Sequence, residues 1–377
     1  MDYIFKTKPY DHQQTALDMG LNRRSFGYFM EMGTGKSKVL IDNMGTLYCA
    51  GEIDFALVLA PKGVYRNWVA KEIPEHLSEK IPHRVIRWVS GANKKQAEEM
   101  RSVQDKFEGL TIFVMNVESF STVKGQKAGQ WLARAFGSRG MIAIDESTTI
   151  KNHKAKRTKS LTKIAAAFQY KRLLTGSPIT KSPMDIFSQA DFLQPGMLGY
   201  DSFYAFQNRY AVLQKVSMGA AAFNKVLGYR NLDELTERID YFSYRVLKKD
   251  CLDLPEKLYT SRYVSLTPEQ AKMYNDIRTE AMTILGDFEL VSAPAVITQL
   301  LRLQQVLCGH LKTDEGDVLT FPTKRTDALL EILEEHSGKA IIWSRFRHDI
   351  IMITETLNNI FGEGVAASYF GDTTDDA

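Results

Sequence analysis

Two short segments carry side chains that suit chemistry on a phosphate ester. In the first, MGTGKS at 32–37, two glycines precede Lys36 and Ser37. Glycine permits backbone conformations that aim successive N–H groups at phosphate oxygens, and the helix expected from Ser37 adds its positive N-terminal end. Lys36 would neutralise the β- and γ-phosphates, and the Ser37 hydroxyl would ligate Mg²⁺. The nucleotide-binding candidates of this segment are Gly33, Thr34, Gly35, Lys36 and Ser37.

The pattern of this loop is incomplete at one position. The full motif begins with glycine, where this chain has Met30. A chance Gly-Lys-Ser turn at a helix start is therefore an alternative interpretation. The apolar run 26–30 directly before the loop favours the phosphate-binding interpretation, since such loops join a strand to a helix.

The second segment, Asp145-Glu146, ends the apolar run MIAI. Carboxylates at the carboxyl edge of a parallel sheet face the crevice in which ligands bind. We expect Asp145 to hold Mg²⁺ and Glu146 to act as the general base that orients water. An ordinary helix N-cap is the alternative for the pair. His153, close to these carboxylates in the sequence, is a second candidate general base. We favour Glu146, because Glu146 already supplies a general base and a second one is not needed.

The elements that must position these groups follow from short apolar runs separated by helical patterns. This alternation predicts an α/β domain with a parallel sheet covered on both faces. The expected strands are 26–30, 55–60, 111–116, 141–145 and 172–176, and the helices include 37–50, 67–77 and 158–168.

Beyond residue 180 the pattern changes. Apolar positions at helical spacing predict a helical excursion over about 183–250, and we assign its aromatic residues at 187–210 to a core rather than to base stacking. The small-residue segment 217–228 is interpreted as a loop. Further on we expect helices at 268–285, 293–308, 323–336 and 348–361, and strands at 258–266, 339–343 and 365–370.

Composition narrows the class of protein. At 377 residues, two or three domains are expected. With 48 Lys plus Arg against 45 Asp plus Glu, net charge neither shows nor excludes a polyanionic partner. The three cysteines form no disulfide framework or zinc set. The polar N-terminus and the lack of a long apolar run predict a cytoplasmic protein without a membrane partner, in the host cytoplasm if the source is viral.

Taken in order, these segments resemble the motifs of superfamily-two helicases, and most closely those of SWI/SNF-type DNA-dependent ATPases. The phosphate loop resembles the family's E-M-G-x-G-K-[ST], and Asp145-Glu146 with 150–152 resembles its motif II. The remaining resemblances are PYDHQ (9–13), LAPK (59–62) with Asn67, Trp68 and Glu72, LTGSPI (174–179), FLQPGMLG (192–199), YRVLKKD (244–250), LTPEQAKMY (266–274), IIWSRF (341–346) and YFGDTT (369–374).

The resemblance implies a RecA-like lobe over 1–265, a helical linker over 266–320 and the opening part of a second RecA-like lobe over 321–377. It implies ATP and Mg²⁺ as cofactors and duplex DNA, without sequence specificity, as partner. Gln13 would recognise adenine, and Thr148, Thr175, Gly176 and Ser177 would couple the nucleotide site to movement. The implied DNA contacts are Lys62, Asn116, Ser119 and Arg345.

A basic segment adds an electrostatic candidate for DNA contact. Residues 151–172 contain lysines and arginines, Lys151 and Arg172 among them, and no acidic residue. Such a run can follow phosphates. A solvated helix face explains any one of its lysines equally well.

Two departures from the family pattern shape the functional hypotheses. Thr148 stands where the family has His or Asp, and no segment up to Ala377 resembles motifs V and VI, which supply arginine fingers. We therefore expect a truncated motor of phage or bacterial type that couples ATP hydrolysis to movement on duplex DNA. The alternatives are a catalytically weak, nucleotide-dependent module that binds DNA or an unknown protein partner, and a strand-separating helicase or restriction-type translocase.

Overall fold

The computed structural model describes residues 2–218, 221–286, 293–313 and 315–371. The chain divides into two compact units, Met1–Pro255 and Glu256–Ala377. Each unit is described by itself below.

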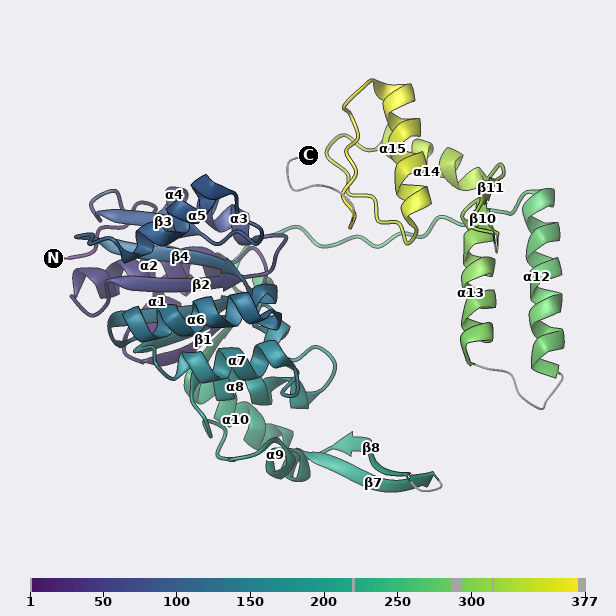
Figure 1. The fold of residues 1–377 in the computed structure, drawn as a ribbon. Coiled ribbons are helices and arrows are strands. Elements are labelled where there is room, and N and C mark those ends of the chain that lie inside the picture. The colour runs from purple at the N-terminus through teal and green to yellow at the C-terminus, as the bar shows by residue number, and fades with distance from the viewer. Residues whose placement is uncertain (1, 219–220, 287–292, 314, 372–377) are drawn as a thin grey trace. The chain divides into compact units, whose positions relative to one another are not determined.

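A seven-stranded parallel sheet forms the centre of the first unit (Figure 1). Its strand order is β3-β4-β2-β5-β6-β1-β9. The five predicted strands are confirmed, within one or two residues at most ends. The bounds are β1 Ser25–Met30, β2 Phe55–Ala60, β3 His83–Arg87, β4 Leu110–Asn116, β5 Gly140–Asp145, β6 Tyr170–Leu174 and β9 Ser243–Val246.

The two strands that the sequence did not predict, β3 and β9, are the edges of this sheet. An edge strand is buried less completely than a central one, so its sequence need not be continuously apolar. HRVIR in β3 and SYRV in β9 both carry arginine. The central strand β2, by contrast, is buried at every position.

Alternate residues of the sheet supply two separate cores. In β2, Leu57 and Leu59 belong to one core, whereas Val58 and Ala60 belong to the other. One core is closed by α1 (Asp11–Leu21) and α2 (Lys36–Cys49). The other is closed by α6 (Val123–Phe136), α7 (Lys156–Ala165) and α8 (Ile186–Leu193). The predicted helices 37–50 and 158–168 are thereby confirmed.

The helix expected over 67–77 is interrupted. The chain forms α3 (Tyr65–Asn67), a π-helical turn (Trp68–Glu72) and α4 (Ile73–His76). The Ile73 N–H bonds to the carbonyl of Trp68, five residues back. Pro74 follows directly and has no N–H to continue the α-helical ladder, which gives a local reason for the wider turn.

The excursion after β6 contains a β-hairpin as well as helices. Helix α9 (Phe203–Tyr210) leads into β7 (Ala211–Met218), which pairs antiparallel with β8 (Ala221–Tyr229). The loop interpretation of 217–228 was therefore wrong, apart from residues 219–220, which lie outside the described residues. Figure 1 shows the hairpin projecting away from the sheet beyond α9. Helix α10 (Leu232–Phe242) then returns the chain to β9.

The aromatic residues of 187–210 confirm the core assignment with one exception. Phe187, Phe192, Phe206 and Tyr210 are buried, but Tyr204 is 62% exposed. Helical spacing alone did not separate Tyr204 from its buried neighbours.

The second unit consists mainly of helices. The four predicted helices are confirmed as α12 (Pro268–Gly286), α13 (Ala293–Leu307), α14 (Lys324–Glu335) and α15 (Arg347–Phe361). Strands β10 (His310–Lys312) and β11 (Val318–Thr320) form an antiparallel pair.

Three strand predictions in this part of the chain were wrong. Residues 258–266, 339–343 and 365–370 pair with no strand among the described residues. A strand is stabilised by hydrogen bonds to a neighbour, and an apolar pattern cannot supply the neighbour. Ile341 and Trp343 are correspondingly 83% and 91% exposed.

No helix in the described ranges is both long and apolar enough to cross a membrane.

Candidate nucleotide-binding site

The loop between β1 and α2 has the backbone that phosphate binding requires. Gly33 and Gly35 have φ angles of 82° and 88°, in the left-handed region that favours glycine. Gly35 is the N-cap of α2, so the N–H groups of the first helical turn are free of intrahelical partners. The loop therefore presents backbone donors and the positive end of a helix in one place.

Gln13 and His12 hold this loop from the side of α1. The Gln13 amide donates to the carbonyl of Thr34 at 3.1 Å and accepts from the Tyr10 N–H at 3.1 Å. The His12 ring is 2.9 Å from the same Thr34 carbonyl. A Cβ on Gly35 would lie 2.2 Å from the Gln13 Nε2 atom, so a side chain there would displace the Gln13 amide from its present position.

Lys36 meets Glu146 across the carboxyl edge of the sheet. The Lys36 ammonium is 3.6 Å from a carboxylate oxygen of Glu146, and its side chain is 10% exposed. Thr175, at the end of the intervening strand β6, donates its hydroxyl to the other Glu146 oxygen at 3.3 Å. Three loops that follow β1, β5 and β6 thus converge on one carboxylate.

Glu146 has a strained backbone. Its φ and ψ angles are 50° and 62°, in the left-handed region, which residues other than glycine adopt infrequently. Outliers of this kind cost of order 1–3 kcal/mol and persist where the surrounding structure enforces them. Here the conformation starts a tight turn, Ser147–Ile150, directly after β5.

Asp145 is buried and tethered. Its carboxylate accepts the indole N–H of Trp68 at 3.0 Å and the backbone N–H of Glu146 at 3.0 Å. Burial raises the pKa of Asp145, whereas the Trp68 hydrogen bond and the charge of Lys36 act in the opposite direction. The charged carboxylate is therefore costly in the free protein, and a cation bound beside it would stabilise it.

The side chains present fit a magnesium ion that is shared with a nucleotide. Mg²⁺ is usually held by one or two carboxylates together with substrate phosphates, with water completing the shell. Asp145 supplies one buried carboxylate, and Ser37, near the start of α2, supplies a hydroxyl. Among the described residues no three metal-binding side chains cluster together. The described side chains at this edge therefore do not form a complete metal site without a nucleotide.

Gly176, a predicted coupling residue, also lies at this site, together with Lys248, which was not predicted to be there. Gly176 packs against the start of the phosphate loop, where an added Cβ would lie 3.3 Å from the Met32 nitrogen. Lys248, in α11 (Lys248–Cys251), donates its backbone N–H to Glu31 at 2.8 Å. Its ammonium would be 3.5 Å from a Cβ on Gly33, so a second lysine lies beside the phosphate loop. The YRVLKKD resemblance marked this segment without indicating what it contacts.

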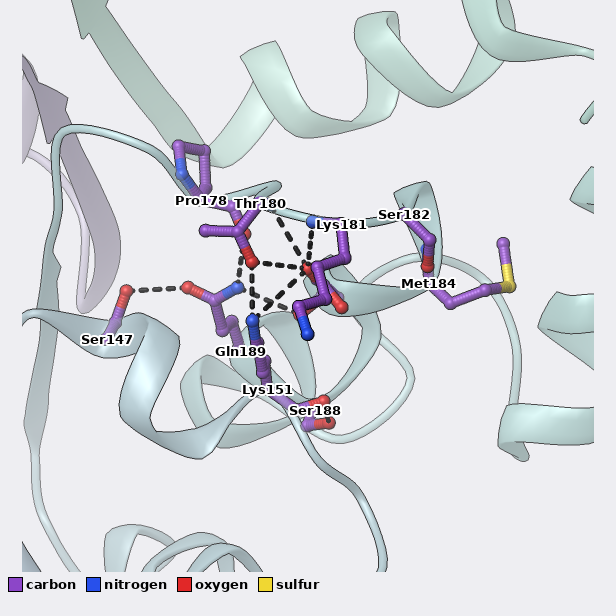
Figure 2. A network of polar contacts seen from close by, with 10 residues as sticks. Ser147, Lys151, Pro178, Thr180, Lys181, Ser182, Met184, Ser188 and Gln189 are labelled. Carbon is purple, nitrogen blue, oxygen red and sulfur yellow. Dashed lines mark hydrogen bonds and ion pairs between the residues drawn. The ribbon is translucent and has the colours of Figure 1, made fainter. Parts of the chain in front are cut away.

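A buried amide connects the loops that follow β5 and β6 (Figure 2). The Ser147 hydroxyl donates to Gln189 at 2.6 Å, and the Gln189 amide donates to the Pro178 carbonyl at 2.7 Å. Gln189 is fully buried on α8. The coupling candidates Thr148 and Ser177 are the sequence neighbours of Ser147 and Pro178, the two ends of this connection. The residue that forms the connection is Gln189. Sequence reasoning missed Gln189 because glutamine within a helix carries no recognisable signal.

Lys151 belongs to the same network. Its ammonium donates to Thr180 at 2.5 Å and lies 3.8 Å from Asp185, whose carboxylate also accepts the backbone N–H groups of Thr180 and Lys181. Figure 2 shows Lys151 directed toward this cluster. Lys151 is thus committed to an internal contact, so its use for DNA would require that contact to loosen.

Three of the DNA candidates lie at the carboxyl ends of β2 and β4. The Glu118 carboxylate accepts the Lys62 backbone N–H at 3.1 Å and contacts the Asn116 amide at 3.5 Å. Ser119 donates to Asn116 at 2.5 Å. The Lys62 side chain is exposed, and Arg345, in the second unit, is exposed as well.

The basic segment is not uniformly available to solvent. Arg172, in β6, is fully buried, and its guanidinium donates to the side chain of Asn43 and to four backbone carbonyls. Including Arg172 in a phosphate track was therefore wrong, because the sequence pattern cannot show the burial of a charged strand residue. His153 packs its ring on Phe203 with 3.7 Å between centroids, and burial lowers its pKa.

A parallel sheet with a glycine loop, a buried acidic strand end and a lysine that contacts it defines the RecA-like class of nucleotide-binding proteins. The profile of the SNF2-related domain matches residues 18–312, and the chain belongs to this family of superfamily-two, SWI/SNF-type ATPases. The family implies nucleotide binding.

Individual relatives are distant. The chain is 24% identical over 362 residues to an uncharacterised ATP-dependent helicase of Mycoplasma genitalium, covering 94% of this chain and 32% of the relative. It is 26% identical to the human DNA repair and recombination protein RAD54-like, covering 74% and 37%. The chain thus spans about a third of the length of such relatives. The SWI2/SNF2 ATPase core of Sulfolobus solfataricus, solved with double-stranded DNA, shares the fold with a TM-score of 0.51 at 22% identity, covering 96% of this chain and 72% of that one.

Proposed function

We propose that this chain is the ATP-hydrolysing part of a motor that moves on duplex DNA. The observation that carries the proposal is the meeting of Lys36 and Glu146 at 3.6 Å beside the buried carboxylate of Asp145. Family membership supports the reaction class, and the similar proteins, which include helicases and a DNA-bound ATPase core, support the substrate.

In this proposal each residue of the loop and strand ends has one task. The backbone donors of Gly33–Ser37 and the Lys36 ammonium bind the triphosphate, and Lys248 adds a second positive charge beside it. Ser37 and Asp145 would hold Mg²⁺, which when bound neutralises charge on the phosphates. Glu146, with Thr175 fixing one of its oxygens, orients the attacking water and accepts its proton. Gln13 keeps the loop in place and is the candidate for reading adenine.

Coupling follows from the contacts between loops. A change at Glu146 reaches the loop after β6 through Thr175 directly and through Ser147, Gln189 and Pro178 indirectly. Lys62, Asn116 and Ser119, at the ends of β2 and β4, would contact the DNA backbone, as would Arg345 in the second unit. We propose the domain limits 1–265, 266–320 and 321–377 as the functional parts of this motor.

Measuring ATP turnover with and without duplex DNA tests the proposal. We expect duplex to stimulate turnover, Lys36→Ala to abolish nucleotide binding or turnover, and Glu146→Gln to keep ATP binding while losing turnover by about 10²–10⁴-fold. Unchanged ATP affinity in Lys36→Ala would contradict the loop assignment. Tight ATP binding with negligible turnover in the unaltered chain would favour a nucleotide-dependent binding module instead.

A further inference from the structure

We propose that the β7–β8 hairpin enters the major groove of duplex DNA and contacts phosphates on both sides of it. This inference rests on the proposed function, in which the chain acts on duplex DNA. It assigns a DNA contact to a segment that the sequence pattern presented only as a small-residue loop.

The segment that contains the hairpin carries positive charge and no acidic residue. Residues 202–232 contain no aspartate or glutamate, and they contain Arg209, Lys215, Lys225 and Arg230. Arg209 pairs with Glu234. Arg230 donates to two backbone carbonyls, which carry no charge. Its own charge is therefore not neutralised by these hydrogen bonds. Lys215 and Lys225 are exposed and form no ion pair with any residue that the structure describes.

The strand register places one lysine on each face of the hairpin. Lys215 lies opposite Asn224, and Lys225 lies opposite Gln214. Neighbouring positions along a strand face opposite sides, so the two lysines lie on opposite faces of the ribbon. A two-stranded ribbon fits the B-DNA major groove, which is about 12 Å wide. A lysine on each face would then meet the phosphates of each wall.

The hairpin would gain stability from a partner that covers it. An isolated two-stranded hairpin is marginally stable in water. Towards its base this hairpin exposes apolar side chains, with Leu227 57% exposed and Val212 41% exposed. A binding partner that covers the ribbon would stabilise it, and the absence of acidic residues in this segment favours a polyanion over a protein surface.

The base of the hairpin adjoins the basic segment of the sequence. His153 stacks on Phe203 of α9, the helix that leads into β7. Lys154 and Lys156 follow His153 and are exposed. Exposed lysines thus lie both near α9, which leads into the hairpin, and on the two arms of the hairpin, and the buried Arg172 is not among them.

The test compares two double variants of the full chain. Lys215→Ala/Lys225→Ala removes the hairpin charges, and Lys94→Ala/Lys95→Ala removes two exposed lysines of α5 (Lys94–Arg101), which packs beside the edge strand β3. Both variants lose the same charge. Duplex affinity is measured against salt concentration, with ATP affinity and circular dichroism as checks on folding.

We expect the slope of log affinity against log salt to fall by about 1.8 in the hairpin variant, from about 0.9 for each lost phosphate contact, and to be unchanged in the α5 variant. Lys215→Arg/Lys225→Arg should keep the original slope. A ligand that occupies the DNA minor groove should leave the difference in slope between the hairpin variant and the unaltered chain unchanged. If this difference disappears when the ligand is present, the assignment to the major groove is overturned.

The failures are distinguishable. If the unaltered chain binds no duplex, the proposed function fails, and this inference fails with it. If the unaltered chain binds duplex and the hairpin variant keeps the full slope, only the hairpin inference is overturned, and a protein surface becomes the better candidate partner.

Discussion

The strands of the first unit and the extended segments of the second have similar sequences but different structures. FALVLA forms β2 and is buried at every position, whereas KAIIW, at 339–343, pairs with no described strand and exposes Trp343. The difference lies in the neighbours, because β2 has β4 and β5 beside it and helices on both faces. An apolar run thus indicates that a segment can form a strand. The strand forms only where a neighbouring strand supplies the hydrogen-bonding partners.

The largest expected effect comes from removing a contact that fixes the first unit. Arg172→Leu removes the guanidinium that donates to the Asn43 side chain and to four backbone carbonyls, two of which, Gly20 and Arg24, also accept backbone N–H groups. Each buried acceptor that is left unpaired costs about 1–3 kcal/mol. We expect the free energy of unfolding of the first unit to fall by at least about 3 kcal/mol. Urea denaturation measures it. The neighbour Lys171→Leu is the control, and equal effects would mean that the polar contacts of Arg172 are unimportant.

Next in size is the tether of Asp145. Trp68→Phe keeps an aromatic ring in the core but loses the N–H that donates to the carboxylate. A misplaced carboxylate should lower kcat about tenfold, which corresponds to about 1.4 kcal/mol, with little change in ATP affinity. Steady-state kinetics and nucleotide titration separate the two quantities. Normal kcat in Trp68→Phe would leave the indole with a packing role only.

A smaller effect is expected at the second lysine of the nucleotide site. Lys248→Ala removes one positive charge beside Gly33 and should weaken ATP binding about fivefold, or about 1 kcal/mol. Lys249→Ala, at the exposed neighbouring position, should not change it. Fluorescent-nucleotide titration measures both. Identical affinities would place Lys248 outside the phosphate site.

The smallest effect is expected in the unpaired segment. Because Trp343 is 91% exposed, Trp343→Ser should change the stability of this chain by no more than about 0.5 kcal/mol. A larger loss would show that 339–343 is packed in solution. That result would remove the contrast with β2.

The two polar edge strands mark the limit of sequence reasoning about the sheet. β3 and β9 lack the continuous apolar run that predicted the other five strands, because each has a neighbour on one side only. The hairpin was missed for a related reason. The alanine and glycine residues of the hairpin have weak strand propensity. In addition, β7 pairs with β8, and no apolar pattern in the sequence indicates this pairing.

The sequence by itself determined the candidate phosphate loop and the acidic strand end, since Gly33, Gly35, Lys36, Asp145 and Glu146 are local patterns whose chemistry depends on residue type and spacing. It also determined the five central strands, which are largely buried and mostly apolar, with Lys171 and Arg172 of β6 as the charged exceptions. Only the tertiary structure decided that Trp68 holds Asp145, that Gln189 connects two loops, that Lys248 lies beside Gly33 and that Arg172 is buried. Those contacts join residues far apart in the chain, and their existence depends on how strands are ordered in the sheet, which residue type and spacing do not specify.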